Sequence, residues 1–288
     1  MKKTLSLIMV LALSLSLFAA CSQTGTAPAK ETPSSTSEAA PSTVDEASEV
    51  PAEGDSANAE GDGAVLIYLT RHGKTMLNTT DRVQGWADSP LTEAGVEVAK
   101  QLGRGLALSD VQFDAAYSSD SGRSIETAHI VLEQVEQADL ELHQLKDIRE
   151  WNFGGFEGAY NDEMIEGAIA ATGYNGEQDI RVGLPLNELA DGIAAADETK
   201  TAENWEAIAK RSKSGIDYIA QTTAENGGGT VLVVAHGLTI NSILKVIDPD
   251  HQTLNISNAA VSLIKYVDGK YEVLSVNDSS YVEKGKAS

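Results

Sequence analysis

Short apolar runs alternate with amphipathic helical patterns along most of this chain. Four runs have the length and composition of strands, at residues 65–69, 113–117, 140–145 and 230–235. Apolar side chains recur at helical spacing after Thr92, a predicted N-cap, and again within residues 202–223. The second of these helices is expected to be anchored in the core by Trp205, Ile208, Ile216, Tyr218 and Ile219. Strands that alternate with helices predict an α/β fold.

The last part of the chain has the pattern of a β-hairpin. Two strand-like runs, 259–267 and 270–276, flank Asp268 and Gly269, and an Asp-Gly pair between such runs is typical of a tight hairpin turn. This hairpin would add an antiparallel edge to the sheet. We therefore predict that residues 64–288 form one domain, a three-layer αβα sandwich whose mainly parallel sheet has an antiparallel edge strand.

Residues 1–20 have the pattern of a signal peptide. Lys2 and Lys3 precede an apolar run at residues 5–18, which ends in small residues before Cys21. The run is shorter than a membrane-spanning helix requires. The sequence LFAAC resembles the lipobox of bacterial lipoproteins, in which the cysteine is lipidated. We expect a lipid anchor at Cys21 and an extracytoplasmic protein held at the cell membrane; ordinary secretion with a free cysteine is the alternative.

Composition separates the following segment from the predicted domain. Residues 21–63 contain no aromatic side chain and consist mainly of Ala, Ser, Thr, Pro, Gly and Glu, so they are expected to form a disordered acidic tether. A glycosylated Ser/Thr-rich linker is the other interpretation. The formal net charge of -22 makes a nucleic-acid partner improbable. The single cysteine allows no intramolecular disulfide.

Polar side chains follow the predicted strands at the points where each strand ends. Arg71 and His72 follow the first strand, Arg123 opens the helix after the second, Glu150 comes after the third, and His236 follows the fourth. The carboxyl ends of parallel strands meet at one edge of a sheet. An arginine fork suits phosphate, an imidazole can act as nucleophile or base, and a carboxyl group can act as a general acid. Arg71 and His72 alone could equally form a solvated turn, so the interpretation depends on the whole set.

Other reactive side chains carry less weight. Ser118 and Ser119 lack the flanking glycines of a nucleophile elbow. His129, His143 and His251 have no partners at the spacing of metal ligands, and no metal site or cofactor is predicted.

Five ordered blocks show a resemblance to a known family. They read RHGKTMLN from residue 71, QGWADSPLTEAG from 84, YSSDSGRSIETA from 117, REWNFGGFEG from 149 and VVAHG from 233. With these blocks, residues 65–276 resemble the histidine phosphatase superfamily, in the branch of the cofactor-dependent phosphoglycerate mutases and related phosphatases. The resemblance implies that His72 is a nucleophile that becomes phosphohistidine and that Glu150 is the proton donor. It also implies a phosphate pocket formed by Arg71, Asn78, Arg123 and His236.

The sequence also departs from the mutase pattern. Lys74 stands where the mutases carry an acidic residue, and Glu126 replaces a glutamine. With the predicted export signal, Lys74 favours a phosphatase of small phosphate monoesters over a phosphoglycerate mutase, because a mutase needs a cytosolic pool of substrate and of bisphosphorylated cofactor. A non-catalytic surface lipoprotein is a third possibility. Residues 161–200 are interpreted as an insertion or lid that sets substrate choice.

Overall fold

The computed structural model describes residues 63–172, 185–252 and 255–288 of the chain. The predicted signal peptide, the lipidation site Cys21 and nearly all of the predicted tether lie outside the described residues, as does part of the predicted insertion. The signal peptide, the lipidation and the tether therefore stay predictions, as does the role of the insertion. Among the helices that are described, none is long and apolar enough to cross a bilayer.

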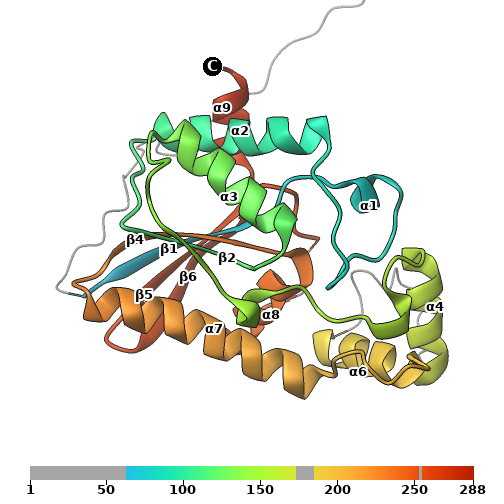
Figure 1. Ribbon diagram of the computed structural model, residues 1–288. Helices are drawn as coiled ribbons and strands as arrows, with labels where there is room; N and C mark the ends of the chain where they lie inside the picture. Colours follow the sequence, from blue (N-terminus) through green and yellow to red (C-terminus); the bar gives the residue numbers. More distant parts are fainter. Residues whose placement is uncertain (1–62, 173–184, 253–254) are drawn as a thin grey trace, which may run out of the picture. The chain divides into compact units, whose positions relative to one another are not determined.

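A six-stranded mixed sheet forms the middle layer (Figure 1). In sheet order its strands are β3 (Leu142–Gln144), β2 (Ala115–Ser118), β4 (Gly229–Ala235), β1 (Val65–Arg71), β5 (Val261–Val267) and β6 (Lys270–Asp278). The first four pair in parallel, whereas β5 pairs antiparallel with both β1 and β6. The predicted fold class, mainly parallel with an antiparallel edge, is confirmed.

The hairpin at that edge turns where the sequence predicted. Asp268 and Gly269 have φ angles of 51° and 77°, so both adopt the left-handed conformation. Two consecutive left-handed residues are what a type I′ turn requires, and its twist matches that of the flanking strands.

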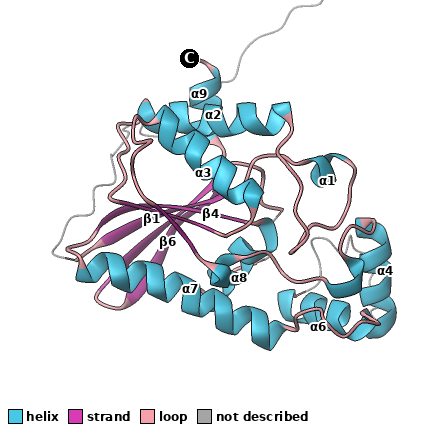
Figure 2. Ribbon diagram, viewed as in Figure 1, coloured by secondary structure: helices cyan, strands magenta, loops and turns pink. Residues whose placement is uncertain are grey.

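Helices cover both faces of the sheet (Figures 1 and 2). On one face lie α2 (Glu93–Ala107) and α3 (Gly122–Gln134), with α9 (Ser280–Lys286) packed on α2. On the other lie α7 (Trp205–Glu225) and α8 (Gly237–Ile247). Side chains of β1 alternate between the two cores: Leu66 and Tyr68 pack with α2 and α3, and the flanking Val65, Ile67 and Leu69 pack with α7 and α8. Burial on both faces explains why this strand is a continuous apolar run.

The helix starts agree with the local signals in the sequence, whereas one residue predicted to lie in the core, Tyr218, does not lie there. Thr92 is the N-cap of α2, where its hydroxyl accepts a hydrogen bond from the amide of Gly95 at 3.0 Å. Asn204 caps α7 in the same way, through the amide of Ala207. Tyr218, which was expected to anchor α7 in the core, is instead 53% exposed. Its ring contacts Tyr117 edge-on near the helix surface.

The part of residues 161–200 that is described forms two packed helices, α4 (Asn161–Thr172) and α6 (Leu186–Ala196) (Figure 1). Their apolar faces build a third core with the turn that follows Glu150; it includes Met164, Ala168, Leu189, Ile193, Trp151 and Phe153. Two short 3₁₀ helices, η1 (Lys146–Ile148) and η2 (Gly154–Phe156), bracket Glu150, and a one-turn helix, α1 (Met76–Thr79), follows β1. These elements surround the carboxyl end of the sheet.

Candidate active site

The predicted site residues gather because β2, β4 and β1 are neighbours in the sheet. Arg71, the last residue of β1, pairs with Ala235 at the end of β4, so the histidines that follow them, His72 and His236, stand side by side. Their ring centroids are 5.2 Å apart. Arg123 reaches the same place from the first turn of α3, which follows β2.

A cavity of about 560 Å³ opens at this edge of the sheet, a volume typical of small-molecule sites. Four of the six predicted site residues line it, namely Arg71, His72, Asn78 and Glu150. The other two, Arg123 and His236, are buried and are not among the residues that line the cavity. The structure therefore places them next to His72 but out of contact with the cavity.

His72 is held in one tautomer by a backbone carbonyl. Its Nδ1 lies 2.7 Å from the carbonyl oxygen of Gly73. A carbonyl can only accept, so Nδ1 carries the proton and Nε2 keeps its lone pair. His72 is only 3% exposed and lines the cavity. Its Nε2 therefore carries a free lone pair on a largely desolvated side chain.

Electrostatics keep this imidazole neutral. Burial lowers the pKa of His72 well below 6.5, and the positive charges of Arg123 and Arg71 lower it further, against the opposing hydrogen bond to Gly73. At neutral pH the ring is therefore unprotonated at Nε2 and available as a nucleophile.

Arg71 has unsatisfied hydrogen-bonding capacity. Its Nη1 donates to the carbonyl of Ile256 at 2.6 Å, while its buried Nε has no acceptor among the residues described. Burial lowers the pKa of Arg71, and the negative charge of Glu150 opposes this; the guanidinium still stays charged in a protein. A buried donor without a partner is costly, and because Arg71 also lines the cavity, its positive charge favours an anion there.

Glu150 is fixed at the first turn of α8. Its carboxylate accepts hydrogen bonds from the amides of Thr239 (2.9 Å) and Leu238 (3.1 Å), and also from the Thr239 hydroxyl and the amide of Trp151. Free amides at a helix N-terminus favour an anion. The sequence placed Glu150 beside an aromatic turn, but the helix start that orients it comes from a segment more than 80 residues away, as its separation of 88 from Leu238 shows.

His236 has no ring nitrogen free for a ligand in this structure. Its Nδ1 accepts from Nε of Arg123 at 3.2 Å, so its Nε2 carries the proton and donates to the hydroxyl of Ser119 at 2.7 Å. Burial lowers the pKa of His236 well below 6.5, followed by the charge of Arg123. The ring is a neutral link between Arg123 and Ser119.

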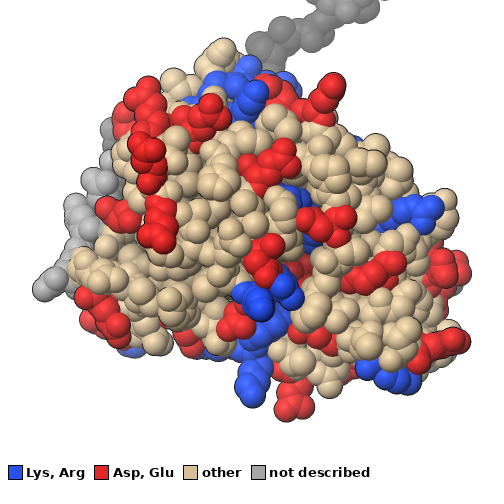
Figure 3. Space-filling view, viewed as in Figure 1, with Lys and Arg blue, Asp and Glu red and all other residues tan. Residues whose placement is uncertain are grey.

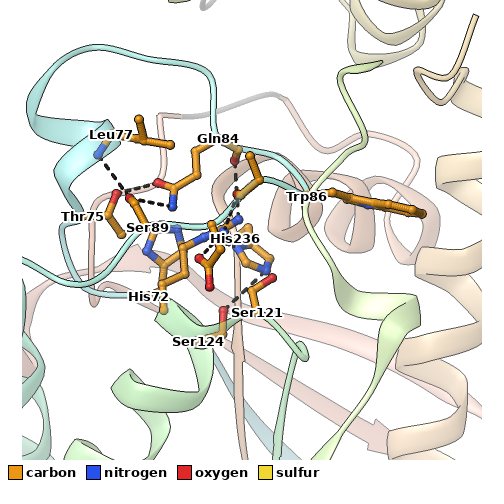
Figure 4. Close-up of polar contacts among 12 residues, drawn as sticks. His72, Thr75, Leu77, Gln84, Trp86, Ser89, Ser121, Ser124 and His236 are labelled. Carbon is orange, nitrogen blue, oxygen red and sulfur yellow. Dashed lines mark hydrogen bonds and ion pairs between the residues drawn. The ribbon is translucent and has the colours of Figure 1, made fainter. Parts of the chain in front are cut away.

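Asn78 also has local hydrogen bonds. It closes a capping box with Thr75 at the start of α1. The side-chain oxygen of Asn78 accepts from the backbone amide of Thr75, and the backbone amide of Asn78 donates to the Thr75 hydroxyl. The same hydroxyl donates to Gln84, whose amide group donates to Ser89 (Figure 4). Asn78 thus lines the cavity from a braced turn.

Several cavity residues were not predicted. Polar side chains of this kind are Asp81, Arg82, Gln84, Asn161, Asn241, Asn255 and Asn258, and apolar ones include Val83, Phe153, Met164, Ile165, Leu189 and Leu238. Asn258 donates to the backbone carbonyl of His72 at 2.8 Å from 186 residues further along the chain. No sequence signal distinguished Asn258, because only folding brings it to the nucleophile. Gln84 did lie in a matching block, which could have indicated it.

The surface around the site agrees with the acidic composition. On the face shown in Figure 3, acidic side chains are scattered widely and Lys and Arg side chains gather in few places. Lys74, predicted to favour a phosphatase over a mutase, is exposed and lines the cavity. Within the described part of the chain, no three His, Cys, Asp or Glu side chains are grouped so that they could hold a metal ion.

Comparisons with known proteins give the same family as the site. The chain is similar to a 2,3-bisphosphoglycerate-dependent phosphoglycerate mutase of Methylorubrum populi, with 29% identity over 64% of this chain and 79% of that protein. Among solved structures it resembles phosphoglycerate mutase from Bacillus anthracis str. Sterne, with a TM-score of 0.75 and 50% identity over 78% of this chain and 98% of that one. It also resembles Bacillus stearothermophilus YhfR, with a TM-score of 0.60 and 27% identity over 76% and 99% of the two chains. Residues 67–279 match the histidine phosphatase superfamily (branch 1), and this protein is a member of that family.

Proposed function

We propose that this protein is a phosphatase that hydrolyses small phosphate monoesters through a phosphohistidine formed on His72. One observation carries the proposal. His72, whose Nε2 is unprotonated, and the positively charged Arg71 line the same cavity, close enough for the charge of Arg71 to lower the pKa of His72. A nucleophile near a cation that can stabilise the phosphoryl oxygens is what phosphoryl transfer requires.

In the first step, Nε2 of His72 attacks the phosphorus atom and the bond from phosphorus to the ester oxygen breaks. The bonding electrons leave with that oxygen, which takes a proton from Glu150. Arg71 stabilises the charge on the equatorial oxygens of the phosphoryl group. The products of this step are the alcohol, phosphohistidine and the Glu150 carboxylate.

In the second step, a water molecule attacks the phosphohistidine and gives a proton to Glu150. The bond from Nε2 to phosphorus breaks, inorganic phosphate leaves, and His72 and Glu150 return to their starting forms. The protonated carboxyl group of Glu150 thus acts as the acid in the first step, and the carboxylate it leaves acts as the base in the second.

We extend the proposal to Asn78, Arg123 and His236 as the rest of the phosphate site, on the strength of the family resemblance. Arg123 and His236 already have protein partners for their side-chain nitrogens. Direct contact of either residue with phosphate would need an exchange of hydrogen bonds. The positive charge of Arg123 still acts on His72, because it is one of the causes of the lowered pKa of His72.

A phosphoglycerate mutase is the second candidate, because the relatives from Methylorubrum populi and Bacillus anthracis carry that name. The two activities differ in what accepts the phosphoryl group from His72: water in a phosphatase, a phosphoglycerate in a mutase. Incubating the purified protein with p-nitrophenyl phosphate, and separately with 3-phosphoglycerate plus 2,3-bisphosphoglycerate, distinguishes them. Isomerisation with negligible release of inorganic phosphate would reject the phosphatase. Inactivity on both, and on a broad panel of phosphate esters, would favour a non-catalytic binding lipoprotein.

We also propose that the protein is exported and anchored through a lipid on Cys21, on the lipobox-like sequence that ends at this residue. Cells that express the full chain and grow with a radiolabelled fatty acid should incorporate the label into the protein and retain it in the membrane fraction. A Cys21→Ser variant should lose both the label and the membrane association. A labelled Cys21→Ser variant, or an unlabelled wild-type protein, would contradict the anchor.

A further inference from the structure

The carboxylate of Glu157, which does not line the cavity, binds one side of the loop of residues 84–88. Glu157 accepts hydrogen bonds from three consecutive amides, those of Gly85 (3.0 Å), Trp86 (2.8 Å) and Ala87 (3.0 Å). The same carboxylate accepts from the amide of Phe153 at 3.1 Å. Glu157 therefore fixes the loop to the turn that follows Glu150.

The opposite side of this loop faces Arg123. Nη2 of Arg123 donates to the carbonyl of Gly85 at 2.9 Å, and Nη1 donates to the carbonyl of Ala87 at 3.2 Å and to the Asp88 carboxylate at 2.8 Å. Amides point to the anion and carbonyls point to the cation, so the peptide dipoles of the loop are aligned favourably with both charges. The loop orients the buried guanidinium.

Close packing leaves this arrangement little freedom. A Cβ placed on Gly85 would lie 2.3 Å from Oε1 of Glu157 and 2.1 Å from the carbonyl oxygen of Trp151, so only glycine allows the contact. The Trp86 ring turns away from His72 and His236 (Figure 4), and its Nε1 donates to the carbonyl of Glu150 at 3.1 Å. The loop is thereby tied to Glu150, to Glu157 and to Arg123 at once.

We propose that Glu157 is a positioning residue for phosphoryl transfer, acting through the 84–88 loop on Arg123 and through Arg123 on His236 and His72; this inference rests on the proposed function. Arg123 passes the effect on because its Nε donates to His236. The ring of His236 stands beside that of His72. Glu157 itself is not among the residues that line the cavity.

Asp197 provides a matched control. Its carboxylate also accepts four backbone amides, from Gly155, Thr199, Thr201 and Ala202, at 2.8 to 3.0 Å. Like Glu157 it is bound to the turn after Glu150, but its other partners belong to the loop after α6, and none of its hydrogen bonds leads to Arg123. Loss of either carboxylate should reduce stability, whereas only Glu157 should affect His72.

The test compares Glu157→Gln and Asp197→Asn in the full chain. For each variant, thermal unfolding gives the stability, and kcat and KM are measured on p-nitrophenyl phosphate as a function of pH. Calorimetry measures the binding of inorganic phosphate. Glu157→Gln should lower kcat/KM by roughly 10- to 100-fold, the range seen for residues that orient functional groups from behind. It should also displace the acidic limb of the pH profile and weaken phosphate binding. Asp197→Asn should lower the melting temperature and leave kcat/KM of the folded protein within about threefold, as for a change remote from the site.

A double-mutant cycle with Arg123→Met separates positioning from general destabilisation. If Glu157 acts through Arg123, adding Glu157→Gln to Arg123→Met should cost much less activity than Glu157→Gln costs alone. Fully additive losses, or equal loss of activity in Glu157→Gln and Asp197→Asn, would overturn the positioning role. A wild-type protein that hydrolyses no phosphate ester would instead count against the proposed function, and phosphate binding by the variants would still test Glu157.

Discussion

Strands β1 and β4 lie side by side, and each is an apolar run that ends in a histidine followed by a glycine. The two imidazoles nevertheless have different surroundings. His72 has one nitrogen bonded to its neighbour's carbonyl and the other facing the cavity, whereas both nitrogens of His236 are bonded to side chains from the β2–α3 segment. The same local sequence therefore places two histidines alike, and distant partners make only one of them an available nucleophile.

The largest expected effect comes from removing each histidine in turn. His72→Ala should lower kcat by at least about 10⁴-fold, as is usual for a lost nucleophile. His236→Ala should retain measurable turnover, because the attacking atom is still present. After acid-free quenching with a radiolabelled phosphate ester, the label should be found on His236→Ala and be absent from His72→Ala. Label on His72→Ala would show that the two roles are assigned the wrong way round.

Glu150→Gln tests whether Glu150 is the general acid for phosphoryl transfer to His72. Glutamine preserves the shape and some hydrogen bonds at the start of α8 but cannot protonate a leaving oxygen. For alkyl phosphates the rate should fall by roughly 10² to 10⁴-fold, the usual contribution of a general acid. For p-nitrophenyl phosphate the fall should be clearly smaller, because that leaving group needs little protonation. Equal losses on both kinds of ester would argue against the assignment.

The pH profile tests how Arg123, which contributes to the lowered pKa of both histidines, affects the protonation of His72. Because the pKa of His72 is lowered, first by burial and then by Arg123 and Arg71, protonation of Nε2 should begin only well below pH 6.5. The nucleophile must be unprotonated, so the fall in kcat/KM that protonation of His72 causes, after correction for ionisation of the substrate, should appear only at pH values below 6.5. Arg123→Met should move the acidic limb upward, toward 6.5. An acidic limb at 6.5 in the wild-type protein would show that the site leaves His72 with the pKa of an ordinary histidine.

The smallest effect on activity is expected at Ser119, whose hydroxyl contacts His236. Ser119→Ala removes the shorter hydrogen bond of the buried Nε2–H of His236, at 2.7 Å, and leaves the Ser124 hydroxyl at 3.4 Å. The free energy of unfolding should fall by about 1 kcal/mol, as for the loss of one buried hydrogen bond. Urea denaturation measures that loss, and kcat should remain within a few-fold of the wild-type value. A collapse of kcat without loss of stability would mean that Ser119 has a direct role in the reaction.

Much of the fold and half of the site arrangement were accessible from sequence because they depend on local signals. Apolar runs buried on both faces identified the central strands β1, β2 and β4, Thr92 marked a helix start, and Asp268 with Gly269 marked the hairpin. Strand ends that meet at one edge then indicated that Arg71, His72, Arg123, Glu150 and His236 would gather. The exposed position of Tyr218 was missed, because helical spacing cannot tell which side of a wide apolar stripe meets the sheet.

The sequence by itself determined which residue types stand at the ends of the strands, since strand formation and residue order are local properties. Only the tertiary structure decided what each of these residues can do. The lowered pKa of His72, the anchoring of Glu150 at α8 and the enclosure of Arg123 by the 84–88 loop all depend on burial, hydrogen bonds or charges from segments far apart along the chain. A buried polar group takes its partners from whatever the fold brings within about 3 Å, and no pattern along the chain specifies that choice.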